Sequence, residues 1–95
     1  MIDDASTDGS GDVALSYADP RVRLIRNEET LGLTRSLNIG LAAARGELIA
    51  RQDADDVSHP RRLTRQLRLL EQHRDVVLVG SRYRETRPRL PPAAA

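Results

Sequence analysis

The chain alternates short apolar runs with stretches whose leucines recur at helical spacing, and this alternation constrains its fold more than any other feature. Each helical stretch carries its leucines on one face: Leu33, Leu37 and Leu41 in the first, and Leu63, Leu67 and Leu70 in the second. A further short helix is expected over 13–18. The apolar runs of strand length are 22–25, 48–50 and 76–79, and Met1-Ile2 is the stub of a further strand. Strands that alternate with helices predict an α/β domain with a mainly parallel sheet flanked by helices.

The composition limits the core and excludes several classes of function. Tyr17 and Tyr83 are the only aromatic residues, so the core must be aliphatic, and we expect low stability. The 15 Arg and the 14 Asp and Glu residues leave a net charge of +1, without a basic stripe in the body of the chain. We therefore expect no nucleic-acid binding. Since there is no cysteine, a disulfide, a thiolate nucleophile and a Cys-ligated zinc are excluded.

The distribution of apolar and basic residues also predicts the domain boundary and the location. No apolar stretch is long enough to cross a bilayer, and the N-terminus is acidic rather than signal-like. We expect a cytoplasmic protein, associated at most peripherally with the inner face of the membrane. Residues 82–95 are rich in Arg, Pro and Ala without any apolar period, which predicts a folded domain over 1–81 and a disordered basic tail over 82–95.

Two acidic clusters each follow an apolar, strand-like run. One cluster is the Asp3-Asp4 pair with Asp8, and the other is Asp53 with Asp55 and Asp56. In a parallel sheet the carboxyl ends of the strands lie along one edge, where open α/β sheets bind their ligands. Carboxylates gathered there repel each other and also repel phosphate, unless a hard cation lies between them and the anion. We therefore expect Mg²⁺ or Mn²⁺ to bridge these residues to a diphosphate.

Two simpler interpretations of the acidic residues stay open at this point. The Asp, Ser, Thr and Gly residues between positions 3 and 12 are also common in turns and helix caps. The segment Asp4–Gly9 resembles the start of an EF-hand calcium loop as well. Its twelfth position is Leu15, however, where such a loop needs a bidentate glutamate, so calcium binding is disfavoured.

A set of motifs occurs in an order and spacing that resemble a known family. The motifs are Ile2–Ser10, Gly32–Gly40, Ala44–Asp56, Pro60–Gln66 and Val77–Ser81. Over roughly residues 1–81 the chain strongly resembles family-two glycosyltransferases, which build bacterial surface polysaccharides. The resemblance implies a GT-A (Rossmann-like) fold, a UDP-sugar or similar donor, a divalent metal, and inversion at the anomeric carbon.

The resemblance also implies roles for individual residues of the donor site. Asp4 would accept a hydrogen bond from the base of the donor, with Asp3 beside it, and Arg35 would contact the nucleotide. Asp53 would approach the ribose or the sugar. Asp55, the second aspartate of the DXD motif, would coordinate the metal on the diphosphate.

The same resemblance predicts that parts of the family's domain are absent. The family's first strand and the acceptor-binding half with its carboxylate base have no counterpart here, so no residue is assigned a catalytic role. Because inversion needs a base that deprotonates the acceptor, we expect a fragment that is inactive by itself. The alternatives are a non-catalytic nucleotide- and metal-binding module, which would have a full-length paralogue as its partner, and an inert remnant of a truncated gene.

Overall fold

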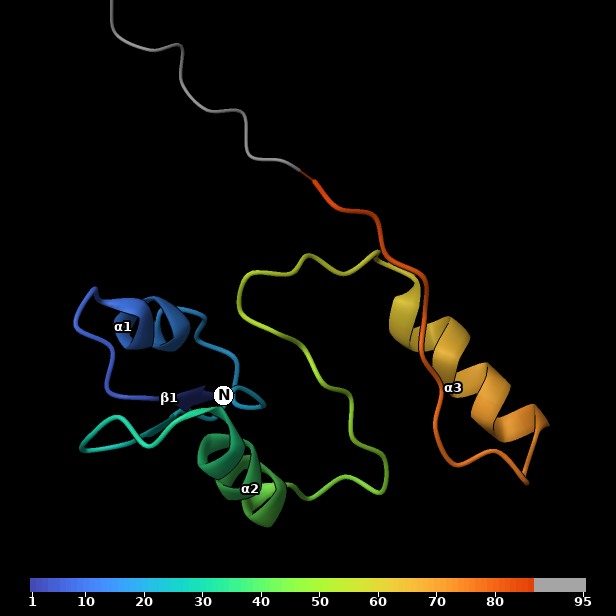
Figure 1. Ribbon diagram of the computed structural model, residues 1–95, viewed down its shortest axis with the longest axis horizontal. Helices are drawn as coiled ribbons and strands as arrows, with labels where there is room; N and C mark the ends of the chain where they lie inside the picture. The colour runs from blue at the N-terminus through green and yellow to red at the C-terminus, as the bar shows by residue number, and fades with distance from the viewer. Residues whose placement is uncertain (87–95) are drawn as a thin grey trace, which may run out of the picture. The chain divides into compact units, whose positions relative to one another are not determined.

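The computed structural model describes residues 1–86. These residues divide into two compact units, Met1–Ile49 and a second unit that begins at Ala50. We call these the N-terminal and the C-terminal unit and describe each by itself (Figure 1). The part of the predicted tail beyond residue 86 lies outside the described residues. Within the described part of the chain, no helix is long and apolar enough to cross a membrane.

The N-terminal unit is built on a two-stranded parallel sheet. Strand β1 (Ile2–Asp3) pairs with β2 (Ile25–Arg26), so that Ile2 lies opposite Ile25 and Asp3 opposite Arg26. The Ile25 amide donates to the Met1 carbonyl at 3.0 Å, and the Asn27 amide donates to the Asp3 carbonyl at 2.9 Å. The parallel pairing confirms the predicted α/β class, with the strand pair flanked by helices.

Helix α1 (Ser10–Leu15) connects the two strands, and it begins earlier than the predicted helix over 13–18. Asp8 determines this start, because its Oδ1 accepts hydrogen bonds from the Ser10 amide at 3.0 Å and the Ser10 hydroxyl at 2.5 Å. Gly9 adopts a left-handed φ of 81°, which brings the chain into the helix. At the other end, the Ser16 hydroxyl donates to the Val13 carbonyl at 2.5 Å. The bonds of Asp8 and Ser16 to near neighbours therefore mark the two ends of this helix.

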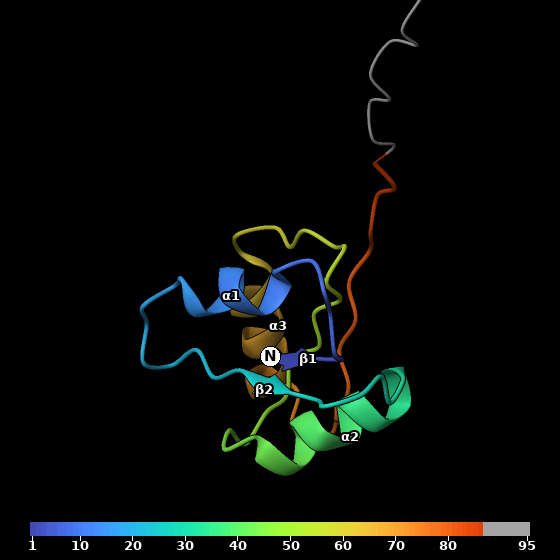
Figure 2. The same ribbon diagram turned by 90° about the vertical axis from the view of Figure 1, so that its left-hand side faces the viewer.

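Helix α2 (Leu33–Ala43) matches the prediction from the leucine spacing. Figure 2 shows α1 and α2 on opposite sides of the strand pair. Helix α2 lies close to β1 at Gly40, where an added Cβ would lie at an ordinary contact distance of 3.4 Å from Cγ1 of Ile2. The core between these elements is small: Ala14 and Ser36 are 4% and 8% exposed.

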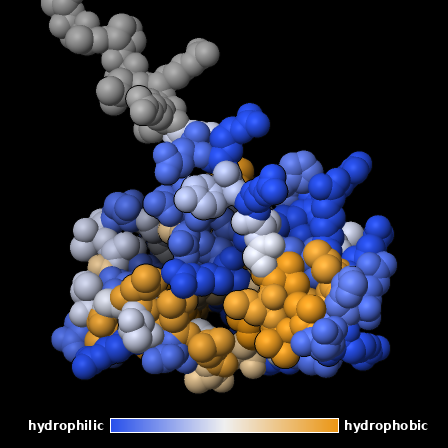
Figure 3. All heavy atoms as spheres, turned by 45° about the vertical axis from the view of Figure 1, so that its right-hand side comes forward, coloured by the Kyte–Doolittle hydropathy of each residue, from blue (hydrophilic) through white to orange (hydrophobic). Residues whose placement is uncertain are grey.

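The C-terminal unit contains one helix among its described residues, α3 (Arg62–Gln72), as the second leucine stripe predicts. The predicted strands at 48–50 and 76–79 are wrong, because both segments are irregular in the structure. A strand exists only when a neighbour completes its hydrogen bonds, and the sheet in the described residues contains β1 and β2 alone. Val77 and Leu78 are accordingly 94% and 85% exposed, and Figure 3 shows hydrophobic areas that reach the surface.

Candidate functional site

Asp3 lies at the end of β1 and is held by the turn that follows the strand. Its Oδ1 accepts hydrogen bonds from the Ser6 amide at 3.0 Å and from the Ser6 hydroxyl at 2.5 Å. These bonds, together with the nearby Arg26 guanidinium, lower the pKa of Asp3 below its ordinary value. Among the described residues no hydrogen bond reaches Oδ2 of Asp3. This aspartate is therefore ionised, and its Oδ2 lies beside Gly11 of α1.

Asp4 has a different environment from its neighbour, because it is bonded to residues far along the chain. Its Oδ1 accepts hydrogen bonds from the Leu31 amide at 2.7 Å and from the side-chain amide of Asn27 at 2.9 Å. Its Oδ2 accepts the Gly32 amide at 2.9 Å. These donors and the Ser36 hydroxyl lower the pKa of Asp4, with the Leu31 amide contributing most. Both oxygens of Asp4 are thus engaged within the protein.

Asn27 links this carboxylate to α2, and the sequence analysis did not assign it a role. Its Nδ2 donates both to Asp4 and, at 3.1 Å, to the hydroxyl of the buried Ser36. The signal that could have found it is its position: a polar residue directly after a strand, at the same sheet edge as Asp3 and Asp4. We refer to Asp4, Asn27, Leu31, Gly32 and Ser36 as the Asp4 network.

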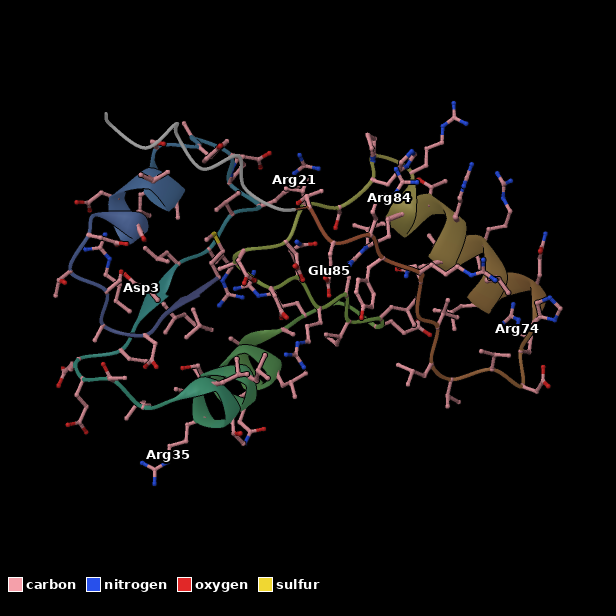
Figure 4. All side chains as sticks on the ribbon, turned by 45° about the horizontal axis from the view of Figure 1, so that its top comes forward. Asp3, Arg21, Arg35, Arg74, Arg84 and Glu85 are labelled. Carbon is pink, nitrogen blue, oxygen red and sulfur yellow. The ribbon has the colours of Figure 1, made fainter. Side chains whose placement is uncertain are left out.

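Arg35 lies in the first turn of α2 and is exposed. Figure 4 shows its side chain pointing away from the strand pair. Within the described residues, no hydrogen bond or ion pair involves its guanidinium. The structure therefore does not bring Arg35 together with Asp3, and its predicted contact with a nucleotide stays a prediction.

Asp53 opens a short turn in the C-terminal unit, which we call the acidic turn (residues 53–56). The Asp56 amide donates to the Asp53 carbonyl at 3.2 Å and closes the turn. Nε of Arg51 donates to Oδ1 of Asp53 at 3.1 Å, so this carboxylate is partly neutralised by an exposed ion pair.

Gln52 braces the acidic turn, and this role was not predicted either. Its Nε2 donates to the carbonyls of Asp53 at 3.2 Å and Asp56 at 2.8 Å. Its Oε1 accepts a hydrogen bond from the Ser58 hydroxyl. One amide side chain thus joins both ends of the turn to the residues that follow it.

Asp55 lies within the acidic turn and is exposed. Among the described residues, no hydrogen bond or ion pair engages its carboxylate. No cluster of three or more His, Cys, Asp or Glu side chains able to hold a metal occurs in the described part of the chain. The donor chemistry therefore does not fit a cation enclosed by protein ligands. It does fit Mg²⁺ or Mn²⁺ held by one or two carboxylates, with phosphate and water as the other ligands.

The predicted site residues fall in both units. Asp3, Asp4 and Arg35 belong to the N-terminal unit, whereas Asp53 and Asp55 belong to the C-terminal unit. Within the N-terminal unit the structure places Asp3 and Asp4 at the carboxyl end of β1, as expected for a ligand-binding edge. The convergence of the two acidic clusters on one ligand stays a prediction.

The N-terminal unit is an α/β unit with paired aspartates at a strand end, which defines the class of the protein only broadly. The comparison with known families is more specific, since "Glycosyl transferase family 2" matches residues 1–92. The chain belongs to this family.

Curated relatives support the same assignment. The EpsE protein of Bacillus subtilis, named as a glycosyltransferase, is 48% identical over 84 residues, which are 85% of this chain and 30% of that protein. An uncharacterized glycosyltransferase of Haemophilus influenzae is 38% identical over 80 residues, 78% of this chain and 25% of its own length. The succinoglycan biosynthesis protein ExoO of Rhizobium meliloti is 40% identical over 67 residues, 70% of this chain and 19% of that protein.

The chain therefore spans less than a third of the length of these relatives. No solved structure gives a significant match.

Proposed function

We propose that this chain binds the donor of a family-2 glycosyltransferase, a nucleotide-diphosphate sugar such as a UDP-sugar, together with Mg²⁺ or Mn²⁺. The observation that carries the proposal is the acidic turn, in which Gln52 fixes the backbone around an unengaged Asp55 carboxylate. A cation at such a turn can link a single protein carboxylate to a diphosphate. Membership of the family supports the choice of a nucleotide sugar as the ligand.

Each residue of the proposed site has a role that follows from its environment. Asp55 would hold the cation, which when bound neutralises the charge of the diphosphate. Asp53, turned toward Arg51, would accept hydrogen bonds from hydroxyl groups of the ribose or the sugar. Asp4, with Asp3 beside it, would face the base of the nucleotide, and Arg35 would contact the nucleotide from the start of α2.

The process that this binding serves is proposed from the relatives. One relative is named for succinoglycan biosynthesis and another for amylovoran biosynthesis, and both of these names denote polysaccharide production. We propose that the donor bound here is used in the cytoplasm, or at the inner face of the membrane, to extend a cell-surface polysaccharide or glycan. For this chain alone we propose donor binding and not transfer, because none of its residues is assigned the role of the base.

Thermal unfolding with UDP and Mn²⁺ tests donor binding. A ligand that binds only the folded state stabilises it by about 2.7 kcal/mol at one hundred times its dissociation constant. In a domain of this size we expect the melting temperature to rise by roughly ten degrees or more. Asp55→Asn should abolish most of the rise, because it removes the charged ligand of the cation.

The matched control is Asp75→Asn, the same change at an exposed aspartate after α3 in the same unit. This variant should keep the full rise. An equal loss in both variants would show that the rise of the melting temperature depends on the net charge of the chain rather than on the acidic turn. No shift in the parent chain, confirmed by the absence of heat in calorimetry at millimolar UDP, would refute the proposed function.

A further inference from the structure

We infer that Arg62 is a positioning residue for the acidic turn, because it fixes the peptide group between Arg51 and Gln52, from which the turn is held. Arg62 is the first residue of α3, and its Nη2 donates a hydrogen bond to the Arg51 carbonyl at 3.2 Å. All three residues lie in the C-terminal unit. The effect of Arg62 on binding of Mn²⁺ with UDP rests on the proposed function, whereas its hold on the peptide group does not.

The hydrogen bond of Arg62 joins α3 to the segment that precedes the acidic turn. Its donor and acceptor are 11 residues apart, whereas the neighbouring Arg61 amide donates to Nδ1 of His59, only two residues away. Among the described residues, no other hydrogen bond runs from a side chain of α3 to residues 50–56. This contact therefore ties the first turn of the helix to the backbone just before the acidic turn.

The peptide group that Arg62 holds lies between the two residues whose side chains hold the acidic turn. On one side, Nε of Arg51 pairs with the Asp53 carboxylate at 3.1 Å. On the other side, Gln52 donates to the carbonyls of Asp53 and Asp56. A rotation of this peptide group would move both side chains at once. Arg62 therefore acts on the turn through its two neighbours in space, Arg51 and Gln52.

The Arg62 side chain is not arranged for stability alone. Its Nε is buried and has no hydrogen-bond partner among the described residues. A buried donor without a partner costs folding free energy, because it has lost its hydrogen bonds to water. The residue is half-buried, and its Nη2 is directed at the Arg51 carbonyl. An apolar side chain of similar length would suit the burial better, but it could not hold the peptide group.

This difference between burial and hydrogen bonding leads to a matched set of variants. Arg62→Met and Arg62→Lys both keep an unbranched stem, and both remove the buried Nε. Only lysine retains a donor at the end of the side chain that can reach the Arg51 carbonyl. The control is Arg65→Met, which removes the same charge from an exposed residue of the same helix. Within the described residues, the side chain of Arg65 forms no hydrogen bond or ion pair.

The hydrogen bond is tested in the free chain by nuclear magnetic resonance of the Arg51 carbonyl carbon and the Gln52 amide. We expect Arg62→Met to shift both resonances, and Arg62→Lys and Arg65→Met to leave them close to their positions in the parent chain. Arg62→Met should not lower the melting temperature, because it also removes an unpaired buried donor. Unshifted resonances in Arg62→Met would overturn the positioning role. A lower melting temperature would overturn it as well, since Arg62 would then act on stability.

Titration calorimetry with Mn²⁺ and UDP measures the consequence for the acidic turn. Once the peptide group is free to rotate, the turn has to be ordered when the ligand binds, which lowers affinity. We expect Arg62→Met to bind roughly threefold to tenfold more weakly, on the scale of one net hydrogen bond. Arg62→Lys should keep most of the affinity of the parent chain, and Arg65→Met should match it.

Failure of this inference and failure of the proposed function give different results. An equal loss of affinity in Arg62→Met and Arg65→Met would show that binding depends on charge, and would overturn the inference. An equal loss in Arg62→Met and Arg62→Lys would overturn it too, because the bond to the Arg51 carbonyl would then have no part in binding. If the parent chain gives no heat with Mn²⁺ and UDP, the proposed function fails. The resonances of the free chain still decide whether Arg62 holds the peptide group.

Discussion

Gly11 lies directly against Asp3: a Cβ built on Gly11 would be 2.6 Å from Oδ2 of Asp3 and 2.8 Å from Nε and Nη2 of Arg26. Both side chains are held where they are, Asp3 by Ser6 and Arg26 by an ion pair with Asp12 at 2.6 Å. The close approach of α1 to the end of the strand pair therefore depends on the absence of a side chain at position 11.

Gly11→Ala and Gly40→Ala should accordingly have opposite effects on stability. Alanine normally favours a helix over glycine by about 1 kcal/mol. At Gly40 the new methyl group would meet Ile2 at an ordinary contact distance of 3.4 Å, so we expect the melting temperature to rise by roughly 4–8 degrees. At Gly11 the overlap must displace Arg26 or Asp3, so we expect the melting temperature to fall.

Circular dichroism at the helix minimum measures both changes in one experiment. The two substitutions are chemically identical and both positions lie within helices, α1 and α2. A rise of the same size in both variants would show that α1 does not pack against Asp3 as described.

Gln52→Ala should weaken binding of Mn²⁺ with UDP without lowering the melting temperature of the free chain. Gln52 holds the acidic turn by donating hydrogen bonds to the Asp53 and Asp56 carbonyls. Because both hydrogen bonds are exposed, losing them costs little folding free energy. The turn then has to be ordered when the ligand binds, which lowers affinity. We expect a loss of roughly threefold to tenfold, on the scale of one net hydrogen bond.

Titration calorimetry measures this loss, and Gln72→Ala at the end of α3 is the control. It removes the same side chain from the same unit but leaves the acidic turn intact. Unchanged affinity in Gln52→Ala would mean that the bracing of the turn has no part in binding.

Acid should destabilise the N-terminal unit. Hydrogen bonds lower the pKa of Asp3, Asp4, Asp8 and Asp19 in the folded chain, with Ser6, Leu31, Ser10 and Arg21 as the main donors. A lowered folded pKa contributes stability above the unfolded value, and this contribution is lost as pH falls through the folded value. The melting temperature should therefore decline as pH drops past 3.8, the ordinary value for these groups.

Thermal unfolding between pH 7 and pH 3 measures the decline. Asp8→Asn should decline less steeply than the parent chain, because it removes one of the groups that binds a proton on unfolding. A melting temperature that stays constant over this range would mean that the hydrogen bonds to these carboxylates do not form in solution.

Helices α2 and α3 could be predicted from the sequence because their signal is local. Leucines at positions 33, 37 and 41 share a face whatever the rest of the chain does. The segments 48–50 and 76–79 are apolar, as a buried strand would be, yet they form no strand. A strand depends on a partner that its own residues do not specify. Composition therefore identifies segments that are suited to a sheet. It does not identify which of these segments are paired in one.

The candidate site shows the same limit. The sequence pointed to Asp3, Asp4, Asp53 and Asp55, and the structure describes each of them at a strand end or in a turn. It could not indicate that Asp4 bonds to Leu31 and Gly32, because nothing in the spacing of these residues predicts the contact. Asn27 and Gln52 were missed for a related reason: their amide groups act on neighbours whose positions only the fold defines.

The Asp4 network has a consequence for the order in which the fold can form. All of its members lie between residues 4 and 36, inside the N-terminal unit, which ends at Ile49. Domains generally fold as units. The strand pair, α1 and the anchored start of α2 can therefore assemble without waiting for the acidic turn or α3, which belong to the other unit.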